Sequence, residues 1–141
     1  MAEVSLHADV GNGVTLRGRV DAVFGNLDAE PTIVDWKTGS WLEDVQPQLA
    51  FYSMLWAIAR GVLPARVEAV SVKTGERVGV EPSTPGIART AQEVGRMVDV
   101  LRSAVDTGID VERRAGPHCR WCPLLASCTE GSAAVDVLTT H

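Results

Sequence analysis

The chain has 141 residues, of which 45% are hydrophobic and 22% charged, so it is long enough to bury the core of one globular domain. No apolar run has the length of a membrane span and no signal-peptide pattern opens the chain, which predicts a cytoplasmic protein without membrane contact. The net charge of −5 argues against tight, unaided binding of duplex DNA, because such affinity comes largely from neutralised phosphates.

Turn residues divide the first part of the chain into three predicted strands, over residues 3–10, 14–24 and 32–37. The turn Gly11-Asn12-Gly13 is typical of a hairpin, so the first two strands are expected to be antiparallel neighbours. The apolar pair Ile33-Val34 predicts that the third strand is buried inside a sheet.

A helix is predicted over residues 47–60, where apolar residues recur at helical spacing up to Gly61. Two short strands follow, over residues 67–72 and 77–80, and then an amphipathic helix over residues 87–105. This order of elements predicts an α/β domain with a mixed central sheet flanked by helices.

The third strand carries the residues that point to chemistry. Asp35 and Lys37 alternate on it, so their side chains leave the same face, and Asp21 lies on the preceding strand. Two carboxylates and an ammonium group are what metal-assisted hydrolysis of a phosphodiester requires. The alternative is that Asp21 is a solvent-facing acid and that Lys37 neutralises its neighbours.

Gln48 and Tyr52 lie four residues apart and therefore share one face of the predicted helix. Their spacing alone leaves two interpretations open. Both contribute to the same site as the strand residues, or Tyr52 packs in the core while Gln48 faces water.

Three cysteines near the C-terminus form the pattern Cys119-x-x-Cys122, five residues, Cys128. An odd, clustered set fits a zinc or iron site better than a disulfide framework. A four-thiolate cluster lacks one ligand in this chain, and His118 and His141 are poor candidates for it. The alternative is a set of reduced thiols without metal.

Four motifs follow one another along the chain: Gly18-x-x-Asp21, Asp35-x-Lys37-Thr38-Gly39, Gln48-x-x-x-Tyr52 and the three cysteines. In this order they resemble the PD-(D/E)XK nuclease superfamily, in particular its RecB-like exonuclease branch. The cysteine spacing resembles the C-terminal part of the iron–sulfur motif of AddB-type helicase–nucleases.

The resemblance implies a restriction-endonuclease-like β-β-β-α-β core and a Mg²⁺- or Mn²⁺-dependent deoxyribonuclease. It implies that Asp21, Asp35 and the peptide carbonyl of Trp36 bind the metal ion. It further implies that Lys37 positions or activates the attacking water.

The resemblance also implies that Gln48 and Tyr52 contact the substrate. For the cysteines it implies an iron–sulfur site, a 4Fe–4S cluster with Cys119, Cys122 and Cys128 as three of its four ligands.

The expected organisation is a nuclease core over residues 1–112, a cysteine knuckle packed on it over residues 113–131, and a tail over residues 132–141. The expected function is that of an exonuclease in DNA repair, recombination or end processing, acting on ends or single strands, with a helicase or another repair subunit as partner. A histidine-bearing helix and a first cysteine precede this pattern in the family and are absent here. The alternative is therefore a catalytically incomplete domain that binds nucleic acid or acts as a scaffold.

Overall fold

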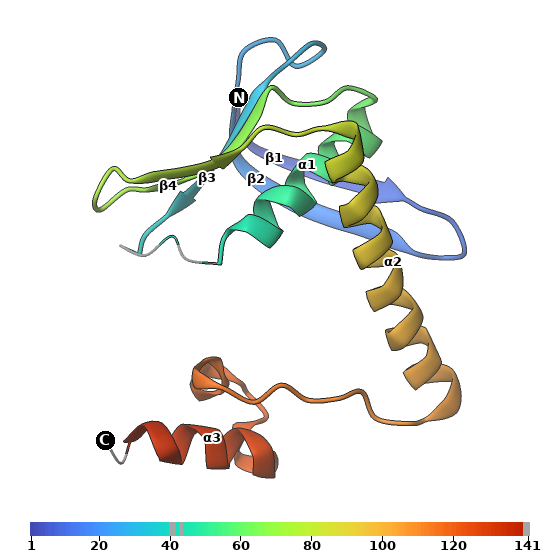
Figure 1. Ribbon diagram of the computed structural model, residues 1–141, viewed down its shortest axis with the longest axis vertical. Coiled ribbons are helices and arrows are strands. Elements are labelled where there is room, and N and C mark those ends of the chain that lie inside the picture. Colours follow the sequence, from blue (N-terminus) through green and yellow to red (C-terminus); the bar gives the residue numbers. More distant parts are fainter. Residues whose placement is uncertain (40–41, 43, 140–141) are drawn as a thin grey trace. The chain divides into compact units, whose positions relative to one another are not determined.

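The computed structural model describes residues 1–39, 42 and 44–139. Its elements follow one another in the order β1 (Ala2–Asp9), β2 (Thr15–Phe24), β3 (Thr32–Lys37), α1 (Gln46–Arg60), β4 (Arg66–Ser71), β5 (Arg77–Val80), α2 (Thr84–Thr107), η1 (Pro117–Trp121), η2 (Leu125–Ser127) and α3 (Thr129–Thr139) (Figure 1). The predicted strands and both predicted helices are present, with ends that differ by at most three residues.

Five strands form one mixed sheet in the order β1-β2-β3-β4-β5. The first three are antiparallel neighbours, β3 and β4 run parallel, and β5 is antiparallel to β4. A parallel pair requires a crossover connection, and α1 supplies it between β3 and β4. The predicted fold class, a mixed sheet with flanking helices and a β-β-β-α-β core, is confirmed.

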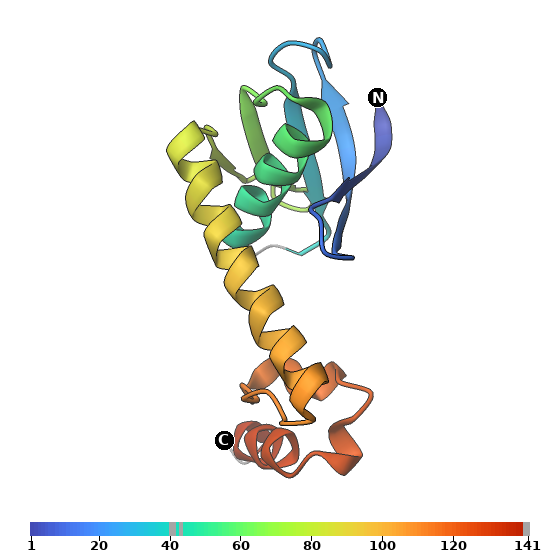
Figure 2. The ribbon, with the colours of Figure 1, turned by 90° about the vertical axis from the view of Figure 1, so that its right-hand side faces the viewer.

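Helix α1 covers one face of the sheet. Its side chains Leu49, Leu55 and Trp56 are fully buried and form the main core with apolar residues of the strands. Figure 2 shows α1, in green, lying along the sheet. The helix ends at Gly61, which takes a left-handed conformation (φ 73°) and donates its N–H to the Ala57 carbonyl over 2.9 Å. Burial of one apolar side fixes the rotation of α1, and hence the direction of its polar residues.

A smaller buried cluster of Ala22, Val34 and Val70 is separate from the main core. Because side chains alternate along a strand, Val34 and Trp36 leave β3 on the face opposite to Asp35. The Trp36 side chain is 42% exposed there. Only the backbone of Trp36 therefore lies near the face of the sheet that carries Asp35.

The chain divides into two compact units, Met1–Arg96 and Met97–His141, and the boundary falls within α2. In the second unit α3 packs against η1 and η2. The segment from residue 132 to Thr139, predicted as a tail, is helical, and the Ser132 hydroxyl donates to the Leu125 carbonyl over 2.8 Å. The predicted domain boundaries at residues 112 and 131 stay predictions. Within the described residues no helix is long and apolar enough to cross a membrane.

Candidate active site

Strand β3 presents Asp35 and Lys37 on the face that α1 covers. Asp35 is 5% exposed, and its Oδ2 atom lies 2.5 Å from Nζ of Lys37. The neighbouring β3 residue on this face, Ile33, is fully buried in the main core, so it anchors the strand. The predicted alternation of the two charged side chains thus produces a close ion pair at the end of a buried strand.

Asp21 joins this pair because β2 and β3 separate next to it. The β2–β3 ladder runs from Phe24↔Thr32 to Ala22↔Val34. One residue further on, Oδ2 of Asp21 accepts a hydrogen bond from the Trp36 N–H over 2.7 Å. The carboxylate therefore takes the place of a ladder hydrogen bond and is held at the backbone of the residue between Asp35 and Lys37.

The side-chain alternation of β2 changes phase at Asp21. Val20 and Val23 both belong to the main core although three positions separate them, whereas Ala22 belongs to the smaller cluster. Strict alternation would place Val20 and Ala22 on one face. The local distortion of β2 is what brings the Asp21 carboxylate to the gap between the two strands.

The peptide carbonyl of Trp36 is directed toward the same gap. In a strand, the N–H and C=O of one residue point to the same neighbouring strand. The Trp36 N–H points to Asp21 on the β2 side, whereas the carbonyl of Lys37, the next residue, accepts the Val72 N–H on the β4 side over 2.9 Å. Asp21, Asp35 and the Trp36 carbonyl thus surround the end of β3.

Gln48 and Tyr52 extend the site onto α1. Lys37 Nζ donates to Oε1 of Gln48 over 2.6 Å, and Nε2 of Gln48 donates to the Tyr52 hydroxyl over 3.1 Å. Gln48 is half-buried and Tyr52 is 9% exposed. The interpretation in which Gln48 faces water apart from the strand residues is therefore wrong for this structure.

Gly18 on β2 makes room for Tyr52. A Cβ atom at Gly18 would lie 2.8 Å from Cδ2 of Leu55 and 3.3 Å from Cε1 of Tyr52. Real side chains do not tolerate the shorter distance, so a residue larger than glycine would require the Leu55 or Tyr52 side chain to shift. The glycine of the Gly18-x-x-Asp21 motif thus leaves room for the Leu55 and Tyr52 side chains against β2.

Burial, and after it the negative charge of Asp35, raises the pKa of Tyr52 above the ordinary 10.0. The Gln48 hydrogen bond and the positive charge of Lys37 act in the opposite direction, and the charge of Asp21 raises the pKa further. Both carboxylates therefore raise the pKa of the Tyr52 phenol, so its hydroxyl lies within the electrostatic influence of Asp21 and Asp35.

We expect the Tyr52 phenol to titrate above pH 10, and the Asp35→Asn variant to titrate at a lower pH than the wild type. Tyr52 is the only tyrosine of the chain, so tyrosinate absorbance measures it directly. Because the folded pKa is raised, the neutral phenol stabilises the fold below the unfolded pKa, and this contribution is lost as the pH rises through the folded pKa. Glu93→Gln, which removes a carboxylate without influence on Tyr52, is the matched control, and equal titrations of Asp35→Asn and wild type would contradict the arrangement.

The donor set fits a hard divalent cation. Asp35 Oδ2 is buried and, although Lys37 is close, has no partner with hydrogen-bond geometry among the described residues. Such an oxygen needs a further positive partner. Within the described part of the chain no group of three or more acidic, histidine or cysteine side chains converges. Two carboxylates and one carbonyl suit Mg²⁺, which takes water and substrate oxygens for its remaining positions.

Two of the three cysteines lie near each other in the second unit. The Sγ atom of Cys128 is 3.3 Å, and Cβ of Cys119 3.6 Å, from the position that a Cβ on Gly131 would occupy. Cys119 Sγ accepts the Gly116 N–H over 3.4 Å and Cys128 Sγ accepts the Gly131 N–H over 3.3 Å. Cys122 is exposed. Among the described residues the three thiols do not form a group that could hold a metal ion, and they are one short of the four ligands of an iron–sulfur cluster.

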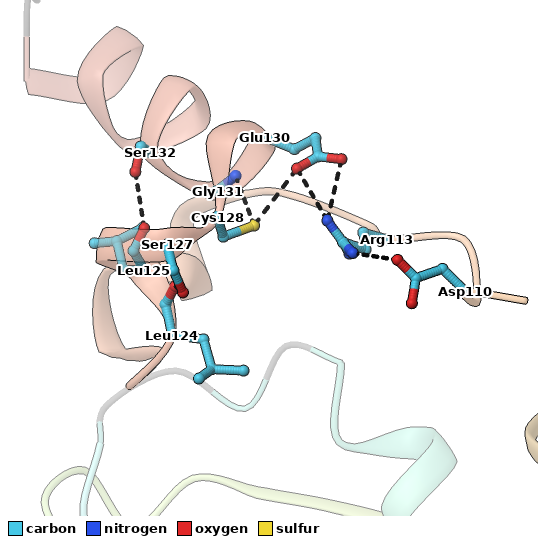
Figure 3. Close-up of polar contacts among 9 residues, drawn as sticks. All are labelled: Asp110, Arg113, Leu124, Leu125, Ser127, Cys128, Glu130, Gly131 and Ser132. Atoms are coloured by element: carbon cyan, nitrogen blue, oxygen red, sulfur yellow. Dashed lines mark hydrogen bonds and ion pairs between the residues drawn. The ribbon is translucent and has the colours of Figure 1, made fainter. Parts of the chain in front are cut away.

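Figure 3 shows the polar contacts that surround Cys128. Its thiol donates to Oε2 of Glu130 over 3.6 Å, and Arg113 pairs with Glu130 at 3.4 Å and with Asp110 at 2.5 Å. A backbone hydrogen bond, and after it the charge of Arg113, lowers the pKa of Glu130. Of the two candidate fourth ligands, His118 bonds through its ring to the Arg114 carbonyl, whereas His141 lies outside the described residues.

Sequence reasoning missed Ser71, a fully buried hydroxyl residue opposite Lys37 in the β3–β4 ladder. Its signal in the sequence is a polar residue within the apolar run Val70-Ser71-Val72.

Comparison with known proteins identifies one family. The family model described as the PD-(D/E)XK nuclease superfamily matches residues 1–129. A search of curated proteins gave no match. A solved structure titled "Crystal structure of SSO0001" is similar with a TM-score of 0.53 and 14% sequence identity, over 93% of this chain and 60% of that one. At this identity the likeness concerns the fold alone, and the chain spans less than two thirds of that protein.

Proposed function

Because the chain belongs to the PD-(D/E)XK nuclease superfamily, we propose that it is a Mg²⁺- or Mn²⁺-dependent deoxyribonuclease that hydrolyses phosphodiester bonds from DNA ends. The observation that carries the proposal is the convergence of Asp21, Asp35 and Lys37 at the end of β3. The Trp36 amide holds Asp21 and the Lys37 ammonium pairs with Asp35, so both acids are tied to neighbouring residues at the end of β3.

In this proposal Asp21, Asp35 and the Trp36 carbonyl hold the cation. When bound, the cation makes water more acidic and offsets negative charge on the phosphate. Asp21 has a second task, because its Oδ2 atom also holds the Trp36 amide. The same carboxylate therefore sets the position of the carbonyl that lies beside it.

Lys37 orients the attacking water or stabilises charge on the phosphoryl oxygens. Its ammonium group has three N–H donors, and Gln48 accepts one of them over 2.6 Å. Asp35 neutralises the charge and limits the directions that Nζ can take. A donor held in place before the reaction is most effective where negative charge grows in the transition state.

Gln48 and Tyr52 place the substrate strand and order Lys37. The hydrogen bonds from Lys37 to Gln48 and from Gln48 to Tyr52 support this role. The Tyr52 ring packs against β2 at Gly18, so packing fixes the tyrosine at which this series of hydrogen bonds ends.

We further propose that the protein belongs to the RecB-like branch and acts with a DNA-gripping partner, such as a helicase, in repair or end processing. The order of the four motifs supports the branch. The net charge of −5 supports the need for a partner, because this chain by itself supplies little attraction for phosphates.

For the cysteines we propose an iron–sulfur site in which Cys119, Cys122 and Cys128 are three of the ligands and the fourth comes from outside the described residues. The N–H···S bonds from Gly116 and Gly131 support it, because such donors stabilise thiolates. We expect anaerobically purified protein to contain iron and to absorb in the visible range, and Cys128→Ser to lose both. Stoichiometric zinc without visible absorbance would show that the site binds zinc instead of iron. Absence of both metals would indicate reduced thiols without a metal.

The test of the nuclease proposal is cleavage of end-labelled linear DNA in Mn²⁺, with covalently closed circular DNA of the same sequence as control. The expected result is release of label from linear DNA, none in EDTA, and intact circles. Cleavage of the circles would show endonuclease activity instead. Binding of DNA without cleavage would favour the incomplete, binding or scaffolding domain.

A further inference from the structure

We propose that Ser71 is a positioning residue for Lys37, and that the turn between β4 and β5 holds the end of the catalytic strand through its hydroxyl. The inference rests on the proposed function, since it concerns the lysine of that site. Ser71 is fully buried and is the ladder partner of Lys37 across β3 and β4.

The Ser71 hydroxyl uses both of its hydrogen-bonding capacities on backbone. It donates to the Gly39 carbonyl over 2.8 Å and accepts the Thr74 N–H over 3.1 Å. One bond reaches the segment that follows Lys37, and the other reaches the turn that follows β4. A single buried oxygen therefore links the two segments.

The backbone around Ser71 strengthens this link. The Ser71 N–H donates to the Glu76 carbonyl over 2.9 Å, and the Ser71 carbonyl accepts the Gly75 N–H over 2.8 Å. The Val72 N–H donates to the Lys37 carbonyl over 2.9 Å. Lys37 and Gly39 are thus both bonded to β4 or its turn, at alternate positions along the chain that leaves β3.

The consequence for Lys37 follows from its side chain. A lysine has a flexible four-carbon stem, so the position of Nζ depends on where its backbone is held. Nζ has to meet Asp35 at 2.5 Å and Gln48 at 2.6 Å together. Without the Ser71 hydroxyl, the Gly39 carbonyl and the Thr74 amide lose their partner, and the strand end is free to shift.

The experiment compares Ser71→Ala with Ser53→Ala in the full chain. Ser53 is a buried serine whose hydroxyl donates to the Leu49 carbonyl within α1. Ser53→Ala therefore also removes a buried hydroxyl that bonds to backbone, but one without a link to Lys37. With both variants folded, we expect Ser71→Ala to lower kcat about 10- to 100-fold with KM little changed, as for a displaced reacting group. Ser53→Ala keeps the wild-type kcat. An unchanged kcat in Ser71→Ala, or a change confined to KM, overturns the inference. If Ser71→Ala does not fold, Ser71→Cys, which retains a weak donor, takes its place, and we expect a lower kcat for it as well.

A second readout does not depend on activity. The chain has two lysines, Lys37 and Lys73, so acetylation followed by mass spectrometry gives their relative reactivity. Lys73 lies in the turn that Ser71 holds, but its side chain is already exposed, so loosening of the turn should change its reactivity little and it serves as the internal reference. We expect Ser71→Ala, and not Ser53→Ala, to raise the Lys37 to Lys73 ratio, and an unchanged ratio counts against the inference. If the wild type fails to cleave DNA, the proposed function is wrong, and the labelling ratio still decides whether Ser71 holds Lys37.

Discussion

Replacement of Lys37 by alanine is expected to lower kcat for DNA cleavage about 100- to 1,000-fold while KM changes little. The reason is that Nζ of Lys37 is fixed by Asp35 and Gln48 before the substrate arrives, so its donor is available at no cost when charge develops on the phosphate. The measurement is single-turnover cleavage of end-labelled DNA in saturating Mn²⁺. Lys37→Arg is not expected to restore the rate, because a planar guanidinium does not reproduce the compact ammonium.

The matched control is Lys73→Ala, which removes the only other lysine, also in a Lys-Thr-Gly sequence. Lys73 is exposed in the turn between β4 and β5, and its loss should leave kcat unchanged. The thermal midpoint gives a second check: Lys37→Ala leaves the buried Asp35 carboxylate without its cation, and added Mn²⁺ should restore part of the lost stability. Cleavage by Lys37→Ala at the wild-type rate would remove Lys37 from the mechanism.

Local sequence patterns are sufficient where a single strand or helix determines which side chains share a face. The period-two pattern of β3 places Asp35 and Lys37 on one face of the strand. The helical period of α1 places Gln48 and Tyr52 on one face of the helix, and Gln48 there bonds to Lys37. The C-terminal segment shows the opposite case. The sequence predicts a tail from residue 132 on, where the structure has most of α3, because this helix depends on packing against η1 and η2 rather than on a strong pattern of its own.

The details that complete the site depend on contacts between distant residues. The sequence does not show that Val20 and Ala22 face opposite sides of the sheet, because both are apolar residues at alternate positions. The change of side at Asp21 arises where β2 and β3 separate. The hydrogen bond from Trp36 to Asp21 and the link from Ser71 to Gly39 join residues that are 15 and 32 positions apart. Sequence patterns predict the candidate site residues, and contacts between distant parts of the chain hold those residues in place.

Asp21→Asn and Asp21→Ala are expected to separate the two tasks of this carboxylate. The Asn side chain retains an oxygen that accepts the Trp36 N–H, so Asp21→Asn should fold with nearly wild-type stability in the absence of metal. Asp21→Ala leaves that amide without its partner and should lower the free energy of unfolding by about 1 kcal/mol. Both variants should lose at least about 100-fold in kcat, because both lack the charge that holds the cation.

Metal-dependent stability then distinguishes a ligand from a structural acid. A cation at 100 times its Kd stabilises the wild type by about 2.7 kcal/mol, measured as the Mn²⁺-dependent rise in the thermal midpoint. Both Asp21 variants should lose most of this rise, whereas Asp28→Asn, an acid in the turn between β2 and β3, should retain it. If Asp21→Asn keeps the full Mn²⁺ effect, Asp21 acts on the Trp36 backbone alone, and the cation is held by Asp35 and other groups. Because Asn and Ala differ in the hydrogen bond and agree in the missing charge, the pair separates the backbone role of Asp21 from its role toward the cation.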